Sequence, residues 1–595
     1  MPERPQAASG GATDSAPRRR RHRPRKKRYA LALVAGGAVV WLALGAVALL
    51  QARASAEAGR ATLDGLRASA SPSALLSGEQ TDDLRRAETS FAAARARLRS
   101  PAVWPLRALP VLGRQVRSFD ALAEAAGAVA GTGADALAEA DELVGGGLPP
   151  GPERAQLLAS LSEVAGRAER RLAGIDLGPD EALLGPLATA RDTFASELEE
   201  LRTTATDARV GTAGVAELLS ESSTYLLLVG NNGEMRAGSG TFLTAGTLFI
   251  DDGRLEVGEL YPTSDLLLAE GVPVEGDLAD RWGWLEPGRE WRNLGITPRF
   301  DVTAPLAARM WAETSGEEVD GVLAVDVVAL QAVLAAAGPI EVEGEQLDAG
   351  NVVRDLLRDQ YAGFEFDEAA QATRSPRLAA VTRAAVGALE SEIDVADLAT
   401  ELGGASRGRH LLAWSPVPEV QSAWEAAGID GALDEDDLLV AMVNRGGTKL
   451  DQYLDVDADL RIEAKDDRTE VTVELRVRNV APDGEPPYVF GPNPALDVAG
   501  GTYVGLVAAT LPGPATGGRF EEVESLAVAG SDGPTRVVAA SVEIPQGDEQ
   551  VMTLRFELPA GFDAMDVLPS ARVPAVQWHS GDMAWSDDHR QRIEW

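Results

Sequence analysis

The chain of 595 residues contains no cysteine and only four histidines. The absence of cysteine excludes disulfide bonds, thiolate catalysis and cysteine-ligated zinc. The histidines, at positions 22, 410, 579 and 589, form no HExxH motif or other paired spacing, so the sequence predicts no metal site of that kind. No serine stands in a GxSxG motif, which argues against a Ser–His–Asp hydrolase.

Basic residues are outnumbered by acidic ones. The chain has 55 lysines and arginines against 92 aspartates and glutamates, and its formal net charge is −37. A surface of this sign repels phosphate polymers, so we expect no nucleic-acid partner. We also expect no cofactor. At ~150 residues per domain, the length predicts three or four domains.

One run, residues 29–50, carries no charged side chain. A helix of this length covers the ~30 Å hydrocarbon core of a bilayer. The preceding block, RRRRHRPRKKR at 18–28, favours the cytoplasmic side. We therefore expect a basic cytoplasmic tail over 1–28, a transmembrane signal anchor over 29–50, and single-pass localisation in the cell membrane with the bulk extracytoplasmic. A cleaved secretory signal and a nucleic-acid-binding tail are the alternatives.

Residues 51–221 are rich in alanine, leucine, glutamate and arginine, with apolar residues at helical spacing, which predicts a helical stalk. Breaks rich in proline or glycine interrupt it near 69–73, 101–113, 145–151 and 178. The break at 101–113 contains Trp104 and several leucines. This composition suits either a loop that contacts lipid headgroups or a connector packed on the helices.

Two further regions follow the stalk. Residues 222–455 alternate apolar strand patterns, such as 223–229, 241–250 and 321–325, with helical ones, which predicts a central α/β domain. After Tyr453, β-rich segments separated by proline, glycine and aspartate predict a β-sandwich over 456–575, followed by a C-terminal tail over 576–595. The expected fold class is α+β multidomain, with a transmembrane helix, a helical stalk, a central α/β domain and a C-terminal β-sandwich.

The densest polar cluster, NNGEMRAGSG at 231–240, directly follows the first predicted strand. Its glycines would let a ligand approach the backbone, and an arginine there would bind a phosphate or carboxylate through two hydrogen bonds. The alternative is an ion pair that closes the loop. The candidate ligand-binding residues of this cluster are Asn231, Asn232, Glu234 and Arg236.

Three tryptophans gather over 282–291 in a segment with glycine and proline. They suit sugar or lipid stacking, or a loop packed by its own aromatic rings. Arg292 and Asn293 are the polar candidates if this segment is a site. The segment NRGGTKLD at 444–451 lacks Walker spacing and predicts a domain junction. The segment after Asp455 lacks the glycine and glutamate of a calcium loop, so we predict no metal site.

Several stretches resemble a bacterial family of membrane-anchored proteins of Gram-positive bacteria, the domain of unknown function numbered four-zero-one-two. They are YLLLVGNNGEMRAGSGTF at 225–242, TPRF at 297–300, DGVLAVD at 320–326, the Gly-Pro pair at 338–339, and residues 444–454. The likeness covers most of 80–560. Because the family is uncharacterised, the resemblance implies kinship and no particular activity.

The layout of 320–342, followed by RSPR at 374–377, is similar to the LytR-CpsA-Psr envelope transferases. These enzymes move glycopolymers from a polyprenyl pyrophosphate carrier to the cell wall. The resemblance implies that Arg236, Arg292, Arg374 and Arg377 bind pyrophosphate. It also implies that Asp326 or Glu234 faces Mg²⁺ or acts as a base.

Three functional hypotheses follow, of which a sensor that passes an external signal inward is the least favoured, and whether the chain is an enzyme stays open. The first is a cell-envelope protein that binds or organises a surface glycopolymer or a protein partner. The alternative is a transferase acting on a glycopolymer linked to polyprenyl pyrophosphate, with Mg²⁺ as cofactor only in that case. The transferase hypothesis predicts that Glu234, Arg236, Arg292 and Arg374 converge in one concave pocket. A membrane, a cell-wall glycopolymer or a lipid-linked precursor are the expected partners.

Overall fold

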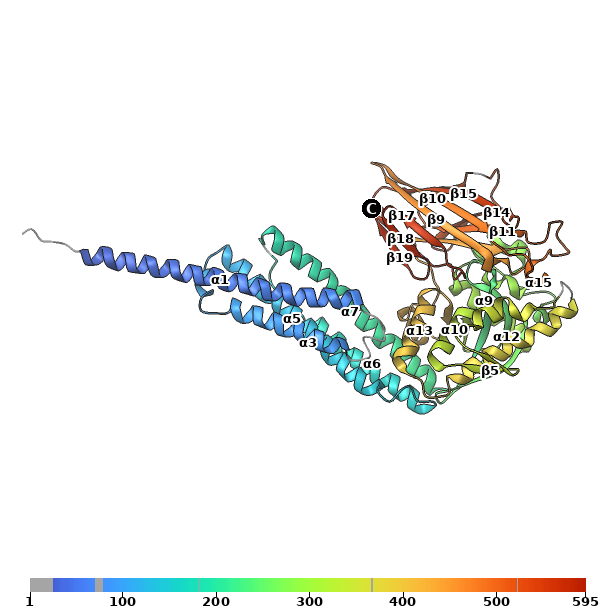
Figure 1. Ribbon diagram of the computed structural model, residues 1–595, viewed down its shortest axis with the longest axis horizontal. Helices are drawn as coiled ribbons and strands as arrows, with labels where there is room; N and C mark the ends of the chain where they lie inside the picture. Colours follow the sequence, from blue (N-terminus) through green and yellow to red (C-terminus); the bar gives the residue numbers. More distant parts are fainter. Residues whose placement is uncertain (1–24, 70–78, 181, 365–367, 522) are drawn as a thin grey trace, which may run out of the picture. The chain divides into compact units, whose positions relative to one another are not determined.

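The computed structural model describes residues 25–69, 79–180, 182–364, 368–521 and 523–595 (Figure 1). Most of the expected basic tail, residues 1–24, therefore lies outside the described residues. Contacts divide the chain into two units, which we describe separately. The first unit comprises Met1–Ala61, Ala87–Gly127 and Asp176–Asp192, and the second comprises Thr62–Arg86, Ala128–Ile175 and Thr193–Trp595.

Long helices build the described part of the chain up to residue 220. They are α1 (Arg25–Ser69), α3 (Glu79–Leu98), α5 (Leu112–Val144), α6 (Pro152–Ala173) and α7 (Gly185–Ser220). Alanine and leucine favour the helical state, and apolar residues spaced by three or four positions form one face. On α3 this face consists of the buried residues Ala87, Phe91, Ala94 and Leu98.

The uncharged run at 29–50 is the first part of α1, which continues into Arg53, Glu57 and Arg60. Near the end of the run, Ala48 and Leu49 pack on a small protein core, and Trp41 Nε1 donates to the Pro101 carbonyl at 3.2 Å. Among the helices that the structure describes, none combines the length and the apolar character needed to cross a bilayer. The expected transmembrane anchor over 29–50 is therefore wrong, and so is the single-pass membrane localisation inferred from it.

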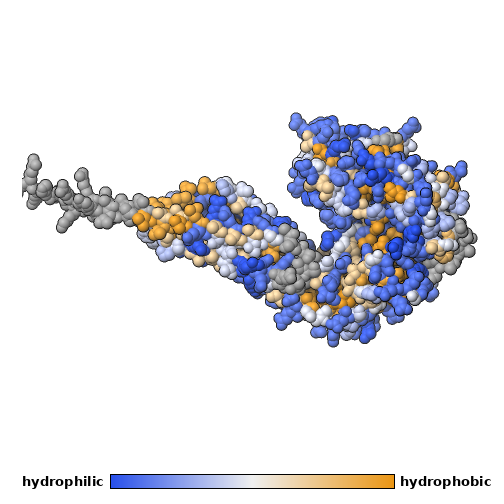
Figure 2. Space-filling view, viewed as in Figure 1, coloured by the Kyte–Doolittle hydropathy of each residue, from blue (hydrophilic) through white to orange (hydrophobic). Residues whose placement is uncertain are grey.

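The break at 101–113 contains the short helix α4 (Trp104–Arg107). Val103 and Leu106 are buried in the first unit, whereas Trp104, Leu109 and Val111 are exposed. Hydrophobic residues are visible at the surface of the helices that follow the grey N-terminal segment (Figure 2). The segment thus packs on the helices through part of its apolar residues, and contact of the rest with lipid stays a prediction.

A five-stranded sheet forms the centre of the second unit, with the order β3-β2-β1-β4-β7. β1 pairs with β4 in parallel, and the other neighbours are antiparallel. Asp252 and Gly253 close the β2–β3 hairpin with positive φ angles of 49° and 75°, as a type I′ turn requires. The strands are β1 (Ser223–Met235), β2 (Gly240–Asp251), β3 (Arg254–Pro262), β4 (Gly321–Val325) and β7 (Leu411–Trp414).

Both faces of this sheet are covered. Successive side chains of a strand point to opposite faces, so Leu226 and Leu228 of β1 join one core, while Leu227 and Val229 join another. The second core also contains residues of α10 and α12. The elements around the sheet are α8 (Gly276–Trp282), α9 (Phe300–Ser315), α10 (Val327–Ala337), α11 (Val352–Leu357), α12 (Glu368–Ala388), α13 (Val395–Arg407), α14 (Pro418–Ala426), and the hairpin of β5 (Ile340–Val342) and β6 (Glu345–Leu347).

Short 3-10 helices and one short α-helix connect these elements. They are η1 (Thr263–Leu266), η2 (Gly283–Leu285), η3 (Trp291–Ile296), η4 (Asp359–Tyr361), η5 (Leu450–Tyr453) and α15 (Pro487–Phe490). Trp282 and Trp291 are almost fully buried in the core on one side of the sheet, where Trp291 Nε1 donates to the Leu266 carbonyl at 2.8 Å. Two of the three clustered tryptophans therefore pack the fold.

Two six-stranded sheets form the C-terminal β region, with the orders β12-β15-β10-β9-β17-β18 and β13-β14-β11-β8-β16-β19. They enclose one apolar core, to which β10 contributes alternate residues from Val471 to Val477. The strands of the first sheet are β9 (Leu454–Ala464), β10 (Arg468–Asn479), β12 (Thr516–Phe520), β15 (Glu549–Pro559), β17 (Gln577–Ser580) and β18 (Met583–Ser586). Those of the second are β8 (Asp437–Asn444), β11 (Tyr503–Leu511), β13 (Val528–Asp532), β14 (Thr535–Ile544), β16 (Ala564–Val567) and β19 (Gln591–Glu594).

The strand positions differ from the expected ranges at both ends of this region. β8 precedes the range 456–575 predicted for the sandwich, and β17 to β19 lie in the range 576–595 predicted as a tail. The outer face of the second sheet also packs on the central sheet, because residues of β8, β11 and β1 share one core. The molecule is thus α+β with a C-terminal β-rich region, as expected apart from the transmembrane helix.

Candidate functional site

β1 extends to Met235 and therefore includes the first half of the polar cluster, residues 231–235, which the sequence placed after the strand. Asn231 and Asn232 are fully buried, and Glu234 and Arg236 are 7% and 5% exposed. The pairing of β1 with β2 is irregular between Asn231 and Met235. This irregularity re-aims the side chains at the end of the strand, so all four polar residues point into the protein.

Glu234 lies between two cations. Its Oε2 is 2.8 Å from Lys449 Nζ, and its Oε1 is 3.2 Å from Arg236 Nη2. Burial alone would raise the pKa of the Glu234 carboxyl, but the positive charges of Lys449 and Arg236 outweigh it and lower this pKa to about 2. Glu234 is therefore ionised, and both of its oxygens are occupied.

Lys449 is fully buried and comes from the segment 444–451, which the sequence identified only as a domain junction. Burial acts to lower the pKa of its ammonium group, and the charge of Glu234 more than offsets this effect. The ammonium also lies 5.9 Å from the centroid of the Tyr361 ring, within range of a cation–π interaction. Lys449 thus stays charged inside the protein.

Asp451 forms a second buried centre beside Glu234. Its Oδ2 accepts hydrogen bonds from Asn444 Nδ2 at 2.7 Å and from the Met235 amide at 3.1 Å. Its Oδ1 lies 3.6 Å from Arg572 Nη1. Burial raises the pKa of the Asp451 carboxyl, although Arg572 and these hydrogen bonds act against the shift. The centre fastens the end of β1 to the segment after β8.

Asp326 organises the other side of the cluster. It caps α10 by accepting hydrogen bonds at Oδ1 from the amides of Val328 and Ala329, at 2.9 and 3.2 Å. Its Oδ2 accepts a hydrogen bond from Asn232 Nδ2 at 2.6 Å and lies 2.7 Å from His410 Nδ1. Burial acts to lower the pKa of His410, and the attraction of Asp326 raises it overall. No oxygen of Asp326 is left for a metal ion.

The remaining predicted residues have separate surroundings. Asn231 Nδ2 donates to the Leu356 carbonyl, and Asn293 Nδ2 donates to the Leu285 carbonyl. Arg292 forms an ion pair of 2.7 Å with Glu290. Its positive charge also helps to lower the pKa of Glu234.

Of the two arginines at 374–377, Arg374 belongs to α12, and its side chain lies outside the described part of the structure. Arg377 is taken up by ion pairs with Glu343, Glu345 and Asp355. The structure therefore brings Glu234 and Arg236 together as a buried ion pair and leaves Arg292 half exposed next to it. The ion-pair interpretation of Glu234 accounts for its geometry.

Arg445 was not among the predicted site residues. It directly follows β8, and its guanidinium carbon lies 5.2 Å from the centroid of the exposed Trp284 ring. Partial burial and repulsion by Arg236 lower the pKa of Arg445. Within the described residues, no carboxylate lies at ion-pair distance from it. The only sequence signal was its place at the end of an apolar run, in a segment without a recognised motif.

The electrostatic balance of this region is positive. Four positive charges lie here, on Arg236, Arg292, Arg445 and Lys449. Two carboxylates, Glu234 and Glu290, oppose them, which leaves a surplus of two positive charges. The whole chain, in contrast, has a net charge of −37. A local surplus of this sign attracts anions. We call Arg292, Arg445 and Trp284 the arginine–tryptophan surface.

Comparisons with known proteins bear on β1 and its surroundings. Residues 220–361 match the sequence model of a family described as "Protein of unknown function (DUF4012)". This match confirms the first expected resemblance, and the likeness to the LytR-CpsA-Psr transferases is not shown. No curated protein and no solved structure matches the chain. The segment that supplies Glu234, Arg236 and Asp326 to the buried cluster is therefore similar to the DUF4012 family of unknown function.

Proposed function

We propose that this protein binds an anionic glycopolymer at the arginine–tryptophan surface and is not itself a catalyst there. The observation that carries the proposal is the position of Arg445, which stacks on the exposed Trp284 without a carboxylate partner among the described residues. A guanidinium group with free donors binds phosphate or carboxylate groups in a planar, two-point arrangement. The ligand group we infer is therefore an acidic substituent.

Trp284 supports a carbohydrate rather than a small inorganic anion. Its side chain is 55% exposed, although large aromatic rings normally bury most of their area. An exposed ring offers an apolar face against which a sugar ring can pack, and the neighbouring arginines supply the charge. The pair therefore suits a polymer that alternates apolar sugar faces with acidic groups.

The buried cluster holds this surface in place. Arg236 Nη1 donates to the Asn444 carbonyl at 3.0 Å, and the Arg445 amide donates to the Val504 carbonyl at 2.9 Å. These two bonds hold the carbonyl and the amide of the peptide group that joins Asn444 to Arg445. Pre-organisation of this kind lowers the entropy that a binding residue loses when the ligand arrives.

A transferase that uses Glu234 or Asp326 as its base has less support. A base must present an oxygen to the substrate, and both carboxylates are occupied by groups of the chain itself. A role of Mg²⁺ depends on that alternative and stays a prediction.

The test measures binding of the full-length protein to three soluble polymers by isothermal titration calorimetry. These are poly(glycerol phosphate), polygalacturonate and neutral dextran. We expect binding to at least one of the acidic polymers, weakening with added salt, and none to dextran. Arg445→Ala and Trp284→Ala should each weaken binding about tenfold, or ~1.4 kcal/mol.

The matched control is Arg461→Ala, which removes the same charge from an exposed site on β9. It should leave the affinity within about twofold, a change of under ~0.5 kcal/mol. Equal affinity of the wild type and Arg445→Ala would contradict the proposal, as would equal binding of dextran and the acidic polymers.

A further inference from the structure

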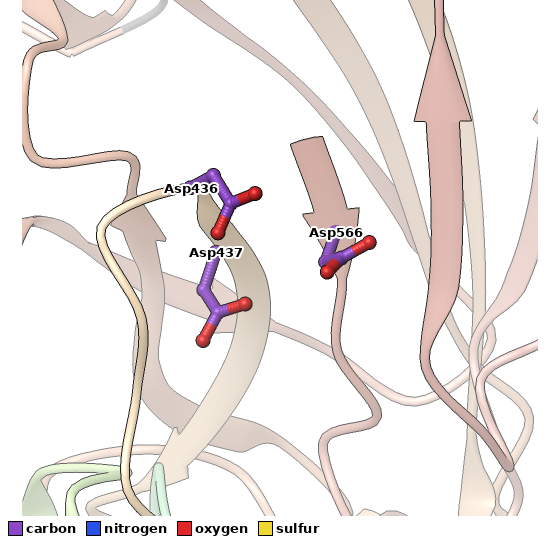
Figure 3. A group of neighbouring side chains, drawn as sticks. All are labelled: Asp436, Asp437 and Asp566. Atoms are coloured by element: carbon purple, nitrogen blue, oxygen red, sulfur yellow. The ribbon is translucent and has the colours of Figure 1, made fainter. Parts of the chain in front are cut away.

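A group of aspartates lies at the start of β8, in the second sheet of the C-terminal β region. β16 runs parallel to β8, with Asp566 directly opposite Asp437 in the register. Asp436 precedes β8, and Figure 3 shows the three side chains beside one another at these two segments. Each offers one carboxylate oxygen, and the three oxygens lie within 4.8 Å of one another.

The surrounding cations neutralise this group only in part. Arg590 lies 3.3 Å from Asp437 and 3.5 Å from Asp434 and Asp566. Arg592 lies 3.2 Å from both Asp436 and Asp566. All four carboxylates lie in ion pairs with these two guanidinium groups, so four negative charges face two positive ones. Arg409 also acts on Asp437 by its charge, while its guanidinium donates to the carbonyls of Pro298 and Gly431.

An independent observation points to a missing ligand. Asp566 is 6% exposed, and its Oδ1 is buried without any hydrogen-bond partner. The other oxygen, Oδ2, pairs with Arg590 and Arg592, whereas a buried oxygen that accepts no hydrogen bond from the protein is destabilised unless a ligand or water pairs with it. Asp437 is fully buried as well, with Oδ2 accepting a hydrogen bond from the Asp434 amide at 2.7 Å.

We propose that Asp436, Asp437 and Asp566 bind one divalent cation, with water in the remaining coordination positions. The oxygen-only ligand set favours a hard ion over zinc or copper. Ca²⁺ accepts irregular arrangements of carboxylates, whereas Mg²⁺ requires a near-octahedral one. Ca²⁺ is therefore the preferred ion. It gives Asp566 Oδ1 a partner and neutralises the surplus charge between β8 and β16.

No sequence motif indicates this site, because Asp566 lies far along the chain from Asp436 and Asp437. The parallel pairing of β8 with β16 brings them together. The site is independent of the arginine–tryptophan surface, so the two proposals can fail separately. Its expected effect is to fasten the start of β8 to β16 and, through Arg590 and Arg592, to the last residues of the chain.

The experiment uses the full-length protein after treatment with a chelator and removal of the chelator. Calorimetric titration with CaCl₂ should give one site, with a Kd on the order of 10⁻⁴ to 10⁻³ M. MgCl₂ should bind more weakly, and millimolar Ca²⁺ should raise the Tm. Absence of both binding heat and a Tm shift with CaCl₂ would overturn the proposal, and so would tighter binding of Mg²⁺ than of Ca²⁺.

Asp566→Asn should weaken Ca²⁺ binding by more than about tenfold. Tenfold is the effect of losing a residue that only supports a ligand, and Asp566 is proposed as a ligand itself. Without the ion, its Tm should not fall, because the substitution removes a buried charge. Asp436→Asn serves as a second variant at a less buried position and should also lose affinity. The control is Asp467→Asn, whose side chain is 75% exposed elsewhere. Unchanged Ca²⁺ affinity in both Asp566→Asn and Asp436→Asn would rule the site out.

Discussion

Glu234 owes its charge to its neighbours rather than to solvent. Lys449 and Arg236 each contact one of its oxygens, and all three side chains are buried. Removing one member of a buried ion pair leaves the other charge without compensation, which destabilises a protein by about 3–5 kcal/mol. At the scale of single residues, this network therefore fixes the end of β1.

The same network makes the free energy of unfolding depend on pH. The pKa of Glu234 is lowered from 4.5 to about 2 in the folded chain. A carboxyl with a depressed folded pKa stabilises the protein above its unfolded pKa, and this contribution disappears as the pH falls through the folded value. The difference in unfolding free energy between wild type and Glu234→Gln should be about 3 kcal/mol at pH 7. It should shrink between pH 4.5 and 2.

Denaturant unfolding followed by tryptophan fluorescence at several pH values measures this difference. Glu470→Gln is the control, because Glu470 is a surface carboxylate paired with Lys465 and Arg468. It should leave the free energy of unfolding close to that of the wild type at every pH, because water and salt screen an exposed ion pair. A difference for Glu234→Gln that stays constant from pH 7 to pH 2 would show that its charge is not what stabilises the fold.

At the scale of elements, β2 and β3 approach more closely at Gly246 than side chains allow. A Cβ atom on Gly246 would lie 2.1 Å from the Glu259 carbonyl oxygen and 2.8 Å from Leu260 Cδ2. The pairing of the two strands is irregular directly after this position. Glycine at this point therefore allows the strands to bend and still share hydrogen bonds.

Gly246→Ala should lower the free energy of unfolding by about 1–3 kcal/mol, because the backbone of β3 has to move. The matched variant is Gly387→Ala in α12, where a Cβ atom would meet nothing within 4 Å. It should raise stability by about 0.5–1 kcal/mol, since alanine loses less conformational freedom in a helix. Chemical denaturation compares the two variants. A neutral effect of Gly246→Ala would mean that the strands adjust without strain.

Sequence patterns predicted local structure better than long-range contacts. The apolar runs at 223–229 and 241–250 correctly indicated β1 and β2, because strand patterns depend on near neighbours. The partners of Glu234 and Asp326 could not be predicted. Lys449 and Glu234 are separated by 215 positions. A run of polar residues has the same appearance in the sequence whether its side chains form a buried ion pair or a ligand-binding site. The transmembrane prediction for the uncharged run at 29–50 was wrong for a related reason. Apolar composition alone does not identify whether a helix packs against lipid or against protein.

At the scale of the whole molecule, the last residues of the chain belong to both C-terminal sheets. β17 pairs in parallel with β9, and β19 pairs with β16. Trp578 on β17 is almost fully buried and stacks on Trp585 with 5.9 Å between the ring centroids. The end of the polypeptide thus completes a core that begins with β8.

Removal of residues 576–595 should abolish cooperative unfolding of the C-terminal β region, because each sheet loses a paired strand. Thermal scans followed by circular dichroism measure this loss. Trp578→Ala, a milder change, should lower stability by about 3–5 kcal/mol. His579→Ala, on the exposed side of the same strand, should stay within ~0.5 kcal/mol of the wild type. A truncated chain with the Tm of the intact one would show that these strands are dispensable.

The core that β1 shares with β8 and β11 extends beyond the residues that match the DUF4012 model. The matched range 220–361 ends well before either of those two later strands begins. Expressed alone, it would present Leu226 and Leu228 to water and leave Glu234 without its lysine. The matched range is thus shorter than the stretch of chain that closes its core, so we expect residues 220–361 alone not to fold independently.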